Sequence, residues 1–284
     1  MATFPERVLA WVNDALTVLV DLVLGPLLGL PPIVSLLVVA LATAAATLPV
    51  VAWTSDQKRL VQTKRGIHAA LFEIRLFNDD LRAVLRALGD ALRHNATYLR
   101  LSLVPLAWMA VPLTLLVAHL HAVYGYAGLE VGKPALIRVE LRSSAASGSA
   151  PPDVVIVAPP GIRVETGPVR LVALNEVLWR SVPDAEGDHT LTVRIGGSAA
   201  TKTLRVSNRL ARRSPGRVSP GLLNQLLYPS EAPLPAGGPI AAIFVPYTEP
   251  GLDVLGWRVH WMMVYALLSV ATALILARRF GITL

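Results

Sequence analysis

The sequence contains no cysteine and few charged residues, and each shortage excludes some classes of function. Without a thiol, the chain forms no disulfide, performs no thiol redox chemistry and builds no cysteine-ligated metal site. Only 16% of its 284 residues are charged, whereas 54% are hydrophobic and the mean hydropathy is +0.54. Soluble domains rarely contain so much apolar sequence, so the composition predicts a membrane protein. The net charge of +7 is spread beside apolar runs, which favours a role in membrane topology over DNA binding.

Three stretches of the chain contain no Asp, Glu, Lys or Arg and are long enough to cross a bilayer as helices. They comprise residues 33–53, 101–120 and 259–277, the last within a predicted membrane segment of residues 257–279. Tryptophans lie near their ends, where an indole ring prefers the membrane interface. We therefore expect an α-helical membrane protein with three transmembrane helices.

The charges beside these stretches predict their orientation. Basic residues outnumber acidic ones in residues 54–100, and Arg278 and Arg279 directly follow the third stretch. The positive-inside rule then places residues 54–100 and the tail 280–284 in the cytoplasm of a bacterial-type inner membrane. The N-terminus and residues 121–256 are expected outside.

Residues 1–32 are apolar but carry one narrow polar stripe. Glu6, Asp14, Thr17 and Asp21 recur at helical spacing. Each aspartate at the centre of a bilayer would cost about 2.5–3.5 kcal/mol. We expect an amphipathic helix that lies in the outer interface with the stripe toward water, and a spanning helix is the alternative.

Residues 54–100 predict a helical hairpin of coiled-coil type. Apolar residues recur at helical spacing in both halves, at Leu60, Ile67, Leu71 and Ile74 and then at Leu81, Val84, Leu85, Leu88, Leu92 and Leu99. Two such helices joined by a short turn are expected to pair antiparallel, stripe on stripe. At the tip, Asn78 is expected to cap the second helix, with Asp79 and Asp80 in its first turn.

The hairpin also carries exposed basic positions. They are Lys58, Arg59, Lys64, Arg65, Arg82, Arg86 and Arg93. We expect them to contact lipid head groups, ribosomal RNA or an incoming chain. The alternative is that they are solvated charges that only set the topology.

Hydroxyl side chains recur inside the uncharged stretches. They are Thr43, Thr47, Ser102, Thr114, Tyr265, Ser269 and Thr272, and Pro105 and Pro112 are expected to kink the second span. One hypothesis is a shallow hydrophilic groove that opens to the cytoplasm and receives a client chain. The alternative is that the hydroxyls bond their own helix backbone and that small residues allow close packing.

The pattern changes to period two from residue 134, within an outer segment of residues 121–207. Short alternating runs such as "ALIRVEL" and "HTLTVRI" are separated by Gly, Pro, Ser and Asp. This predicts an all-β immunoglobulin-like sandwich over about residues 134–207, with Leu191, Val193 and Ile195 facing inward. Residues 208–256 are rich in Pro and Gly and predict an extended return segment, to which "AAIFVPY" adds a candidate strand.

This order of elements resembles the core of the YidC-type membrane protein insertases, in the three-span arrangement of the archaeal and endoplasmic-reticulum branches. The resemblance is carried by "TSDQKRL" after the first span, "LFNDDLRAVLRAL" across the hairpin tip and "VPLAWMAVPLTLL" in the second span. It covers residues 1–120 and, more loosely, the third span. Two features depart from the family: residues 33–53 contain no arginine, and the outer domain follows the second span instead of preceding the core.

The residues supply no catalytic or cofactor signature. There is no P-loop, Gly-x-Ser-x-Gly or His-Glu-x-x-His motif, and His119 with His121 is a weak metal pair without a third ligand. We therefore expect no enzyme activity, cofactor or metal.

The expected function is that of an insertase-like chaperone for client transmembrane helices with short translocated segments. Its expected partners are nascent membrane proteins and the lipid bilayer, with the ribosome or translocon and an envelope partner of the β region as further candidates, and no DNA. One alternative is a membrane-anchored structural or adaptor protein whose β-sandwich binds an envelope partner. A channel or transporter is disfavoured because the spans are uncharged.

The interfacial position of residues 1–32 is tested by cysteine labelling, since the chain has no cysteine of its own. A single cysteine in place of Asp14 or Asp21 is expected to react with an impermeant maleimide added from outside. A cysteine at residue 2 that labels only from the cytoplasm would show instead that this helix spans the membrane.

Overall fold

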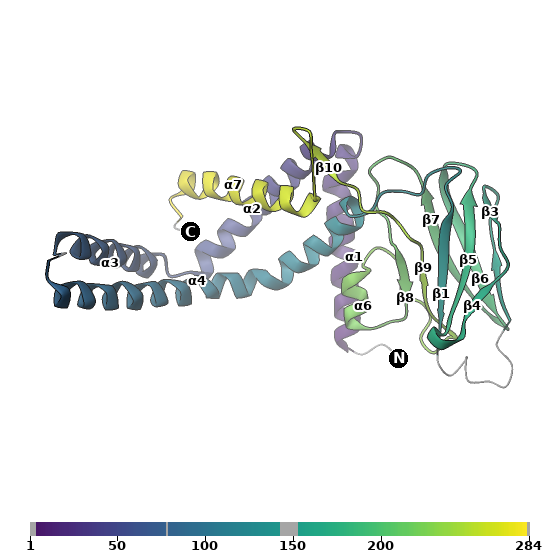
Figure 1. Ribbon diagram of the computed structural model, residues 1–284, viewed down its shortest axis with the longest axis horizontal. Helices are drawn as coiled ribbons and strands as arrows, with labels where there is room; N and C mark the ends of the chain where they lie inside the picture. Colours follow the sequence, from purple (N-terminus) through teal and green to yellow (C-terminus); the bar gives the residue numbers. More distant parts are fainter. Residues whose placement is uncertain (1–3, 78, 143–152, 283–284) are drawn as a thin grey trace. The chain divides into compact units, whose positions relative to one another are not determined.

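The computed structural model describes residues 4–77, 79–142 and 153–282, and of residues 4–7, 9 and 10 it describes the backbone only (Figure 1). The chain forms two compact units. One unit comprises Met1–Ser35 and Leu115–Trp261 and contains the described strands. The other comprises Leu36–Thr114 and Met262–Leu284 and is helical where it is described.

Three helices are long and apolar enough to cross a membrane, as the sequence predicts. They are α2 (Pro32–Thr54), α4 (Leu81–Tyr124) and α7 (Trp261–Phe280). Helix α1 (Phe4–Leu24) precedes the short helix η1 (Gly25–Leu27) and does not meet this criterion of length and composition over its described residues.

Helix α4 joins the second half of the hairpin to the second apolar stretch without a break. It runs for 44 residues and continues through Pro105 and Pro112. Each proline removes one backbone N–H from the helix ladder, but neither ends the helix. The hairpin and the apolar stretch that follows are therefore parts of one helix.

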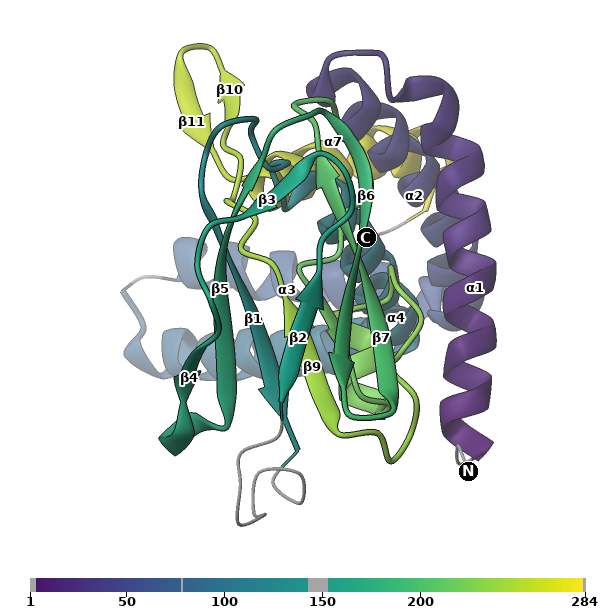
Figure 2. The ribbon, with the colours of Figure 1, turned by 90° about the vertical axis from the view of Figure 1, so that its right-hand side faces the viewer.

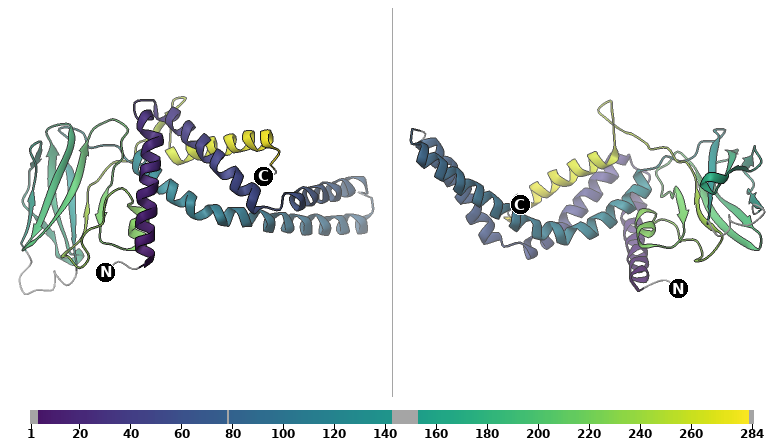
Figure 3. Two further views of the ribbon diagram at one scale, coloured as in Figure 1. Left: turned by 180° about the vertical axis from the view of Figure 1, so that it is seen from behind. Right: turned by 60° about the horizontal axis from the view of Figure 1, so that its bottom comes forward.

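The two hairpin helices lie side by side and antiparallel (Figures 1 and 3). On α3 (Gln57–Leu76) the buried residues are Leu60, Thr63 and Ala70, and Ala87 is buried on α4. A Cβ atom on Gly66 would lie 2.9 Å from the imidazole ring of His94, so this ring packs against the α3 backbone at Gly66.

The expected pairing of stripe on stripe is wrong for α4. Of its predicted apolar row, Val84 is half-buried, and each of the other five side chains is 45–70% exposed, namely Leu81, Leu85, Leu88, Leu92 and Leu99. Ala87 and the leucines lie on different sides of α4, and the side that carries Ala87 is the buried one. The face that carries Ala87 therefore packs on α3, and the leucine row points away from it.

The cap of α4 also differs from the expectation. Asn78 lies outside the described residues, and the helix begins at Leu81, so Asp79 and Asp80 precede it instead of occupying its first turn. The carboxylate of Asp80 accepts hydrogen bonds from the backbone N–H groups of Arg82 at 2.9 Å and Ala83 at 3.3 Å. Aspartate is as good an N-cap as asparagine, so the helix begins two residues later than expected.

The other unit contains two antiparallel sheets. The first sheet has the order β3-β5-β1-β9-β8, with β4 also paired to β5, and the second has the order β2-β6-β7 (Figure 2). The strands are β1 (Ala135–Leu141), β2 (Val154–Val157), β3 (Ile162–Val164), β4 (Val169–Leu171), β5 (Glu176–Pro183), β6 (Gly187–Ile195), β7 (Ser198–Val206), β8 (Gly216–Val218) and β9 (Ile240–Phe244). The short helix η2 (Val172–Leu174) follows β4, and β10 (Leu252–Val254) pairs with β11 (Trp257–Val259) as a separate hairpin.

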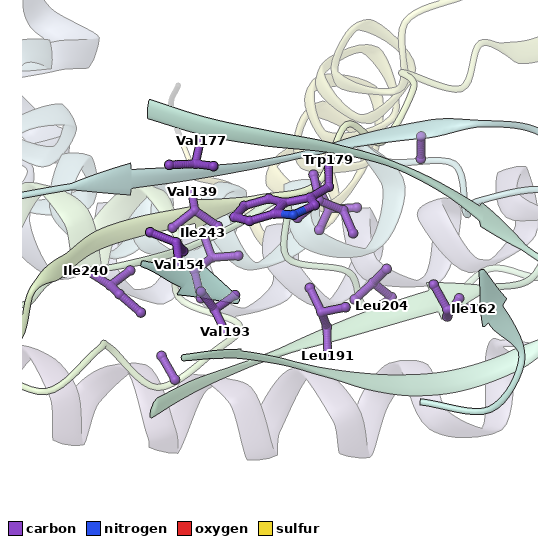
Figure 4. Packing of buried hydrophobic residues seen from close by; sticks show 14 of the residues in the cluster. Val139, Val154, Ile162, Val177, Trp179, Leu191, Val193, Leu204, Ile240 and Ile243 are labelled. Carbon is purple, nitrogen blue, oxygen red and sulfur yellow. The ribbon is translucent and has the colours of Figure 1, made fainter. Parts of the chain in front are cut away.

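Both sheets contribute to one hydrophobic core (Figure 4). The first sheet supplies residues such as Val139, Trp179 and Ile243, and the second supplies Leu191 and Leu204. The predicted alternation on β6 is confirmed, because Leu191, Val193 and Ile195 are buried whereas Arg194 is exposed. Burial of every second residue is what a strand requires when one face lies against a core.

The return segment of residues 208–256 is not only extended chain but contains regular secondary structure. It contributes β8, α6 (Leu222–Leu227) and β9, and β9 lies between β1 and β8 in the first sheet. The candidate strand in "AAIFVPY" is thus confirmed, and the sheet extends beyond the expected end of the sandwich at residue 207. Pairing between β1 and β9 joins residues about a hundred positions apart, which short-range periodicity does not reveal.

Buried charges anchor this return segment to the second sheet. The Lys202 ammonium on β7 donates to the carbonyl of Ser214 at 2.8 Å and to the carboxylate of Glu231. Burial lowers the pKa of Lys202, and the nearby Glu231 carboxylate opposes that shift. The Arg213 guanidinium donates to the carbonyls of Tyr126 and Ser207, and burial also lowers its pKa.

The hairpin interface gives a testable consequence. The change Gly66→Leu is expected to displace the His94 ring from α3 and to lower the free energy of unfolding by about 1–3 kcal/mol, because overpacking strains a close contact. The matched change Gly89→Leu places the same side chain where a Cβ atom meets nothing within 4 Å. Hydrogen exchange over residues 60–74 measures both, and equal exchange rates in the two variants would contradict the close contact.

Candidate functional site

Among the hydroxyl residues predicted to line a groove, two from different helices meet at one described contact. The Tyr265 hydroxyl on α7 donates to Oγ1 of Thr43 on α2 at 3.1 Å, and both residues are buried. Thr43 Oγ1 in turn donates to the carbonyl of Val39 at 2.8 Å. Two residues of the predicted groove are thus brought together within one unit, in a chain of hydrogen bonds that ends on helix backbone.

The other predicted threonines bond their own helices. Thr47 donates to the carbonyl of Ala44 at 3.2 Å, Thr114 to Ala110 at 2.7 Å and Thr272 to Leu268 at 2.7 Å. Local bonding of this kind satisfies a hydroxyl in apolar surroundings without any groove. These contacts favour the alternative reading of the hydroxyls.

The two predicted serines differ from the threonines. Ser102 is half-buried on α4, and Ser269 is half-buried on α7. The Ser269 hydroxyl oxygen is inaccessible to solvent and has no hydrogen-bond partner among the described residues. It is therefore the one member of the predicted set whose polar atom is buried and unsatisfied in the described part of the chain.

The basic residues of the hairpin lie at its surface. Lys58, Arg59, Arg65, Arg82, Arg86 and Arg93 are exposed. Lys64 is half-buried, with its ammonium 5.4 Å from the centre of the Tyr98 ring in a cation–π contact. The charges predicted for partner contacts are thus accessible, apart from Lys64, which is partly used within the hairpin.

On α4 the arginines form a row beside the exposed leucines. Arg82, Arg86, Arg93 and Arg100 follow one another at spacings of four and seven residues, which keeps them on one side of a helix. The leucine row Leu81, Leu85, Leu88, Leu92 and Leu99 occupies the neighbouring side, and both rows are exposed. We call these two rows together the Leu–Arg face. Sequence reasoning placed the leucines inside the hairpin and so missed this surface.

His119 and His121 have separate structural surroundings. The His119 ring is fully buried, and its two nitrogens lie 2.8 Å from the carbonyl of Leu115 and 3.2 Å from that of Asn13. The His121 ring packs edge-on against Tyr126, with ring centres 4.8 Å apart. The described residues include no group of three or more His, Asp or Glu arranged to hold a metal ion.

The contact between Thr43 and Tyr265 can be tested with matched variants. Thr43→Val is nearly isosteric and is expected to lower the free energy of unfolding by about 1 kcal/mol, because it removes the acceptor of the Tyr265 hydroxyl. Thr114→Val makes the same change at an exposed residue and is expected to stay within about 0.5 kcal/mol of the parent chain. Unfolding in mixed detergent micelles measures both, and equal effects would refute the special role of Thr43.

Comparison with known proteins gives no relative for this arrangement. Searches of protein-family models, of curated proteins and of solved structures each returned no match.

Proposed function

We propose that the chain is a membrane protein insertase-like chaperone that assists clients whose transmembrane helices have short translocated segments. The observation that carries this proposal is the Leu–Arg face on a helix that continues into an apolar stretch. An exposed row of leucines is rare on a surface that binds nothing. A spacer between two membrane helices has no need of such a face.

The proposed topology follows the flanking charges and the three apolar helices. We place the hairpin and the C-terminus in the cytoplasm, with α1 and the β unit outside an inner membrane. We also propose that the two sheets form an immunoglobulin-like sandwich, because both are antiparallel and enclose one core.

The two rows of the Leu–Arg face would act on different parts of a client. An apolar client helix gains about 25 cal/mol for each Å² of apolar surface that it buries against the leucine row. The arginine row attracts lipid phosphates or client carboxylates, at about 1 kcal/mol for each residue near an anionic surface. Partition of about twenty apolar residues into lipid then supplies the driving force, so no nucleotide is required.

The order of elements supports placing the chain among YidC-type insertases, although no compared protein matches it. A client groove in this chain would lack the arginine of many family members and would rely on hydroxyls such as Thr43 and Tyr265. The Leu–Arg face compensates in part, because it offers fixed positive charge at the hairpin.

A second candidate function is a membrane-anchored adaptor whose β unit binds an envelope partner. The observation that favours it is the bonding of Thr47, Thr114 and Thr272 to their own helices, which leaves these hydroxyls committed to helix backbone. In this case the spans act only as an anchor.

The leucine row discriminates between the two functions. The double variant Leu88→Gln with Leu92→Gln is expected to slow client insertion into proteoliposomes by about tenfold, which corresponds to about 1.4 kcal/mol of lost binding. Both residues are exposed, so the free energy of unfolding is expected to change by less than about 0.5 kcal/mol.

The matched control is Leu71→Gln with Leu76→Gln on α3, where the exposed leucines do not form a continuous row. This control is expected to insert clients at the parent rate. Normal insertion by the folded Leu88 and Leu92 variant would remove the role of the leucine row and leave the adaptor as the better function.

A further inference from the structure

The three apolar helices meet at one end of each, within the unit that contains the sheets. The Tyr124 hydroxyl at the end of α4 donates to the Ser35 hydroxyl near the start of α2 at 2.7 Å. The Tyr124 ring stacks on the ring of Trp261, the first residue of α7, with ring centres 6.0 Å apart. Tyrosine and tryptophan rings prefer the membrane interface, so these contacts mark the level at which the chain leaves the bilayer in the proposed topology.

The β10–β11 hairpin immediately precedes α7 and projects from the sheets (Figure 2). Only His260 separates β11 from the start of α7 at Trp261. A residue spans at most about 3.6 Å of chain, so the Cα atom of Trp257 lies within about 14 Å of that of Trp261. The covalent chain therefore keeps the hairpin within reach of the head-group region at the end of α7.

The β10–β11 hairpin has one apolar and one charged face. Asp253 lies opposite Arg258, and the other two cross-strand pairs are apolar, Leu252 with Val259 and Val254 with Trp257. Residues opposite each other, and residues two apart along a strand, share one face of a β-sheet. Leu252 at the base of the hairpin is buried, whereas Trp257 beside the turn is 77% exposed. The apolar face therefore continues from a packed base to an exposed tip.

The turn at the tip carries a leucine in a strained backbone conformation. Its two central residues, Leu255 and Gly256, both have positive φ, 54° and 84°, as a type I′ turn requires. Asparagine, aspartate and glycine adopt positive φ readily, whereas leucine does so rarely. Leu255 is 97% exposed, so no packing within the described chain offsets this strain. An exposed, strained leucine beside an exposed tryptophan indicates an apolar environment outside the chain.

We propose that the β10–β11 hairpin inserts its tip into the outer leaflet of the membrane, at the boundary between head groups and acyl chains. Leu255 and Trp257 enter the apolar layer, and the charged face stays at the level of the head groups. Lipid is the occupant that fits, because one residue joins the hairpin to an apolar helix and because a tryptophan ring prefers this interface. The hairpin is then a membrane contact in addition to the three apolar helices. The proposal rests on the membrane location proposed above and does not depend on insertase activity.

The test measures the membrane depth of single nitroxide labels on the full chain in nanodiscs of phosphatidylcholine with phosphatidylglycerol. The chain has no cysteine, so Leu255→Cys and Val172→Cys each give one labelled position. Oxygen concentrates in the acyl layer, whereas a water-soluble nickel chelate is excluded from it. The ratio of oxygen to nickel collision rates is expected to be severalfold higher at residue 255 than at residue 172. Val172 is the matched control, because it is 80% exposed in the same unit but lies in η2, between two strands of the first sheet.

A label at Leu267 of α7 separates failure of this proposal from failure of the membrane location. Leu267 is 69% exposed on an apolar helix, so its ratio is expected to be high. A ratio at residue 255 as low as that at residue 172, with a high ratio at residue 267, would overturn the hairpin proposal alone. Low ratios at all three residues would overturn the membrane location and this proposal with it. No client enters the measurement, so it does not depend on whether the chain inserts clients.

The same labels distinguish lipid from a second copy of the chain. Two tips in contact would bring two labels at residue 255 together and broaden the spectrum by spin–spin coupling. Broadening in discs that hold two chains, with a low ratio in discs that hold one, would assign the tip to a second copy and overturn the lipid assignment. A high ratio in discs that hold one chain supports insertion into lipid.

Two variants at the turn test whether the leucine drives insertion. With the label moved to residue 257 by Trp257→Cys, the change Leu255→Asn is expected to lower the ratio severalfold, because an amide replaces the apolar side chain. Asparagine accepts positive φ, and the Asp253 carboxylate still accepts a hydrogen bond from the Gly256 N–H at 3.0 Å, so the turn is expected to persist. The matched change Leu255→Met keeps an apolar side chain and is expected to leave the ratio unchanged. Equal ratios in the two variants would refute the part of Leu255 in insertion.

Discussion

The side of α4 that packs on α3 determines which residues of the hairpin remain exposed. The helix surfaces meet through Thr63, Ala70 and Ala87, and the Gly66 backbone lies against the His94 ring. Small residues such as alanine lose little side-chain entropy on packing. The leucines of α4 are then turned toward the surroundings beside a row of arginines. The Leu–Arg face is therefore the side of α4 that this packing leaves exposed.

Continuity of helix α4 connects this face to the apolar part of the molecule. In hydrocarbon, every backbone polar group must be satisfied within the chain, and a continuous helix does this with its own hydrogen bonds. The threonine hydroxyls of α2, α4 and α7 are also satisfied within their own helices, because they donate to backbone carbonyls three or four residues earlier. Two described contacts link these helices through hydroxyls, Tyr265 with Thr43 between α7 and α2 and Tyr124 with Ser35 between α4 and α2.

In the unit that contains the sheets, charged side chains are stabilised by ion pairs. Lys202 is enclosed with Glu231, and Arg205 forms an ion pair with Asp188 and donates to the carbonyl of Arg212. The hydrogen-bonded Arg205 guanidinium lowers the pKa of Asp188. The pair therefore stabilises the fold at pH values above the usual aspartate pKa, and this contribution is lost as the pH falls through the lowered pKa. Arg212 of the return segment donates to Asp21 on α1, and Asn13 on α1 donates to the backbone carbonyl of Gln225 on α6. These contacts join α1 to the return segment.

The sequence by itself determined three long apolar helices, a helical hairpin and most of the strands. Uncharged runs of about twenty residues specified three apolar helices, because their length and polarity are local properties. Period-two alternation likewise specified the strands, with Leu191 and Val193 inward, although the short strands β3 and β8 lacked enough residues to show a period. Of the candidate site, the sequence located the basic residues of the hairpin and the hydroxyls of the spans, but it did not determine which of them meet.

Tertiary structure alone decided which side of each element became buried. A helix with leucines on one side and alanines on another can pack by either side, and only the partner helix selects the alanine side. The contact of Asn13 with Gln225 likewise joins α1 to a residue more than two hundred positions away. Local pattern carries no signal for such contacts, because they depend on how separate elements close on one another, and that closure is governed by the packing of the whole chain.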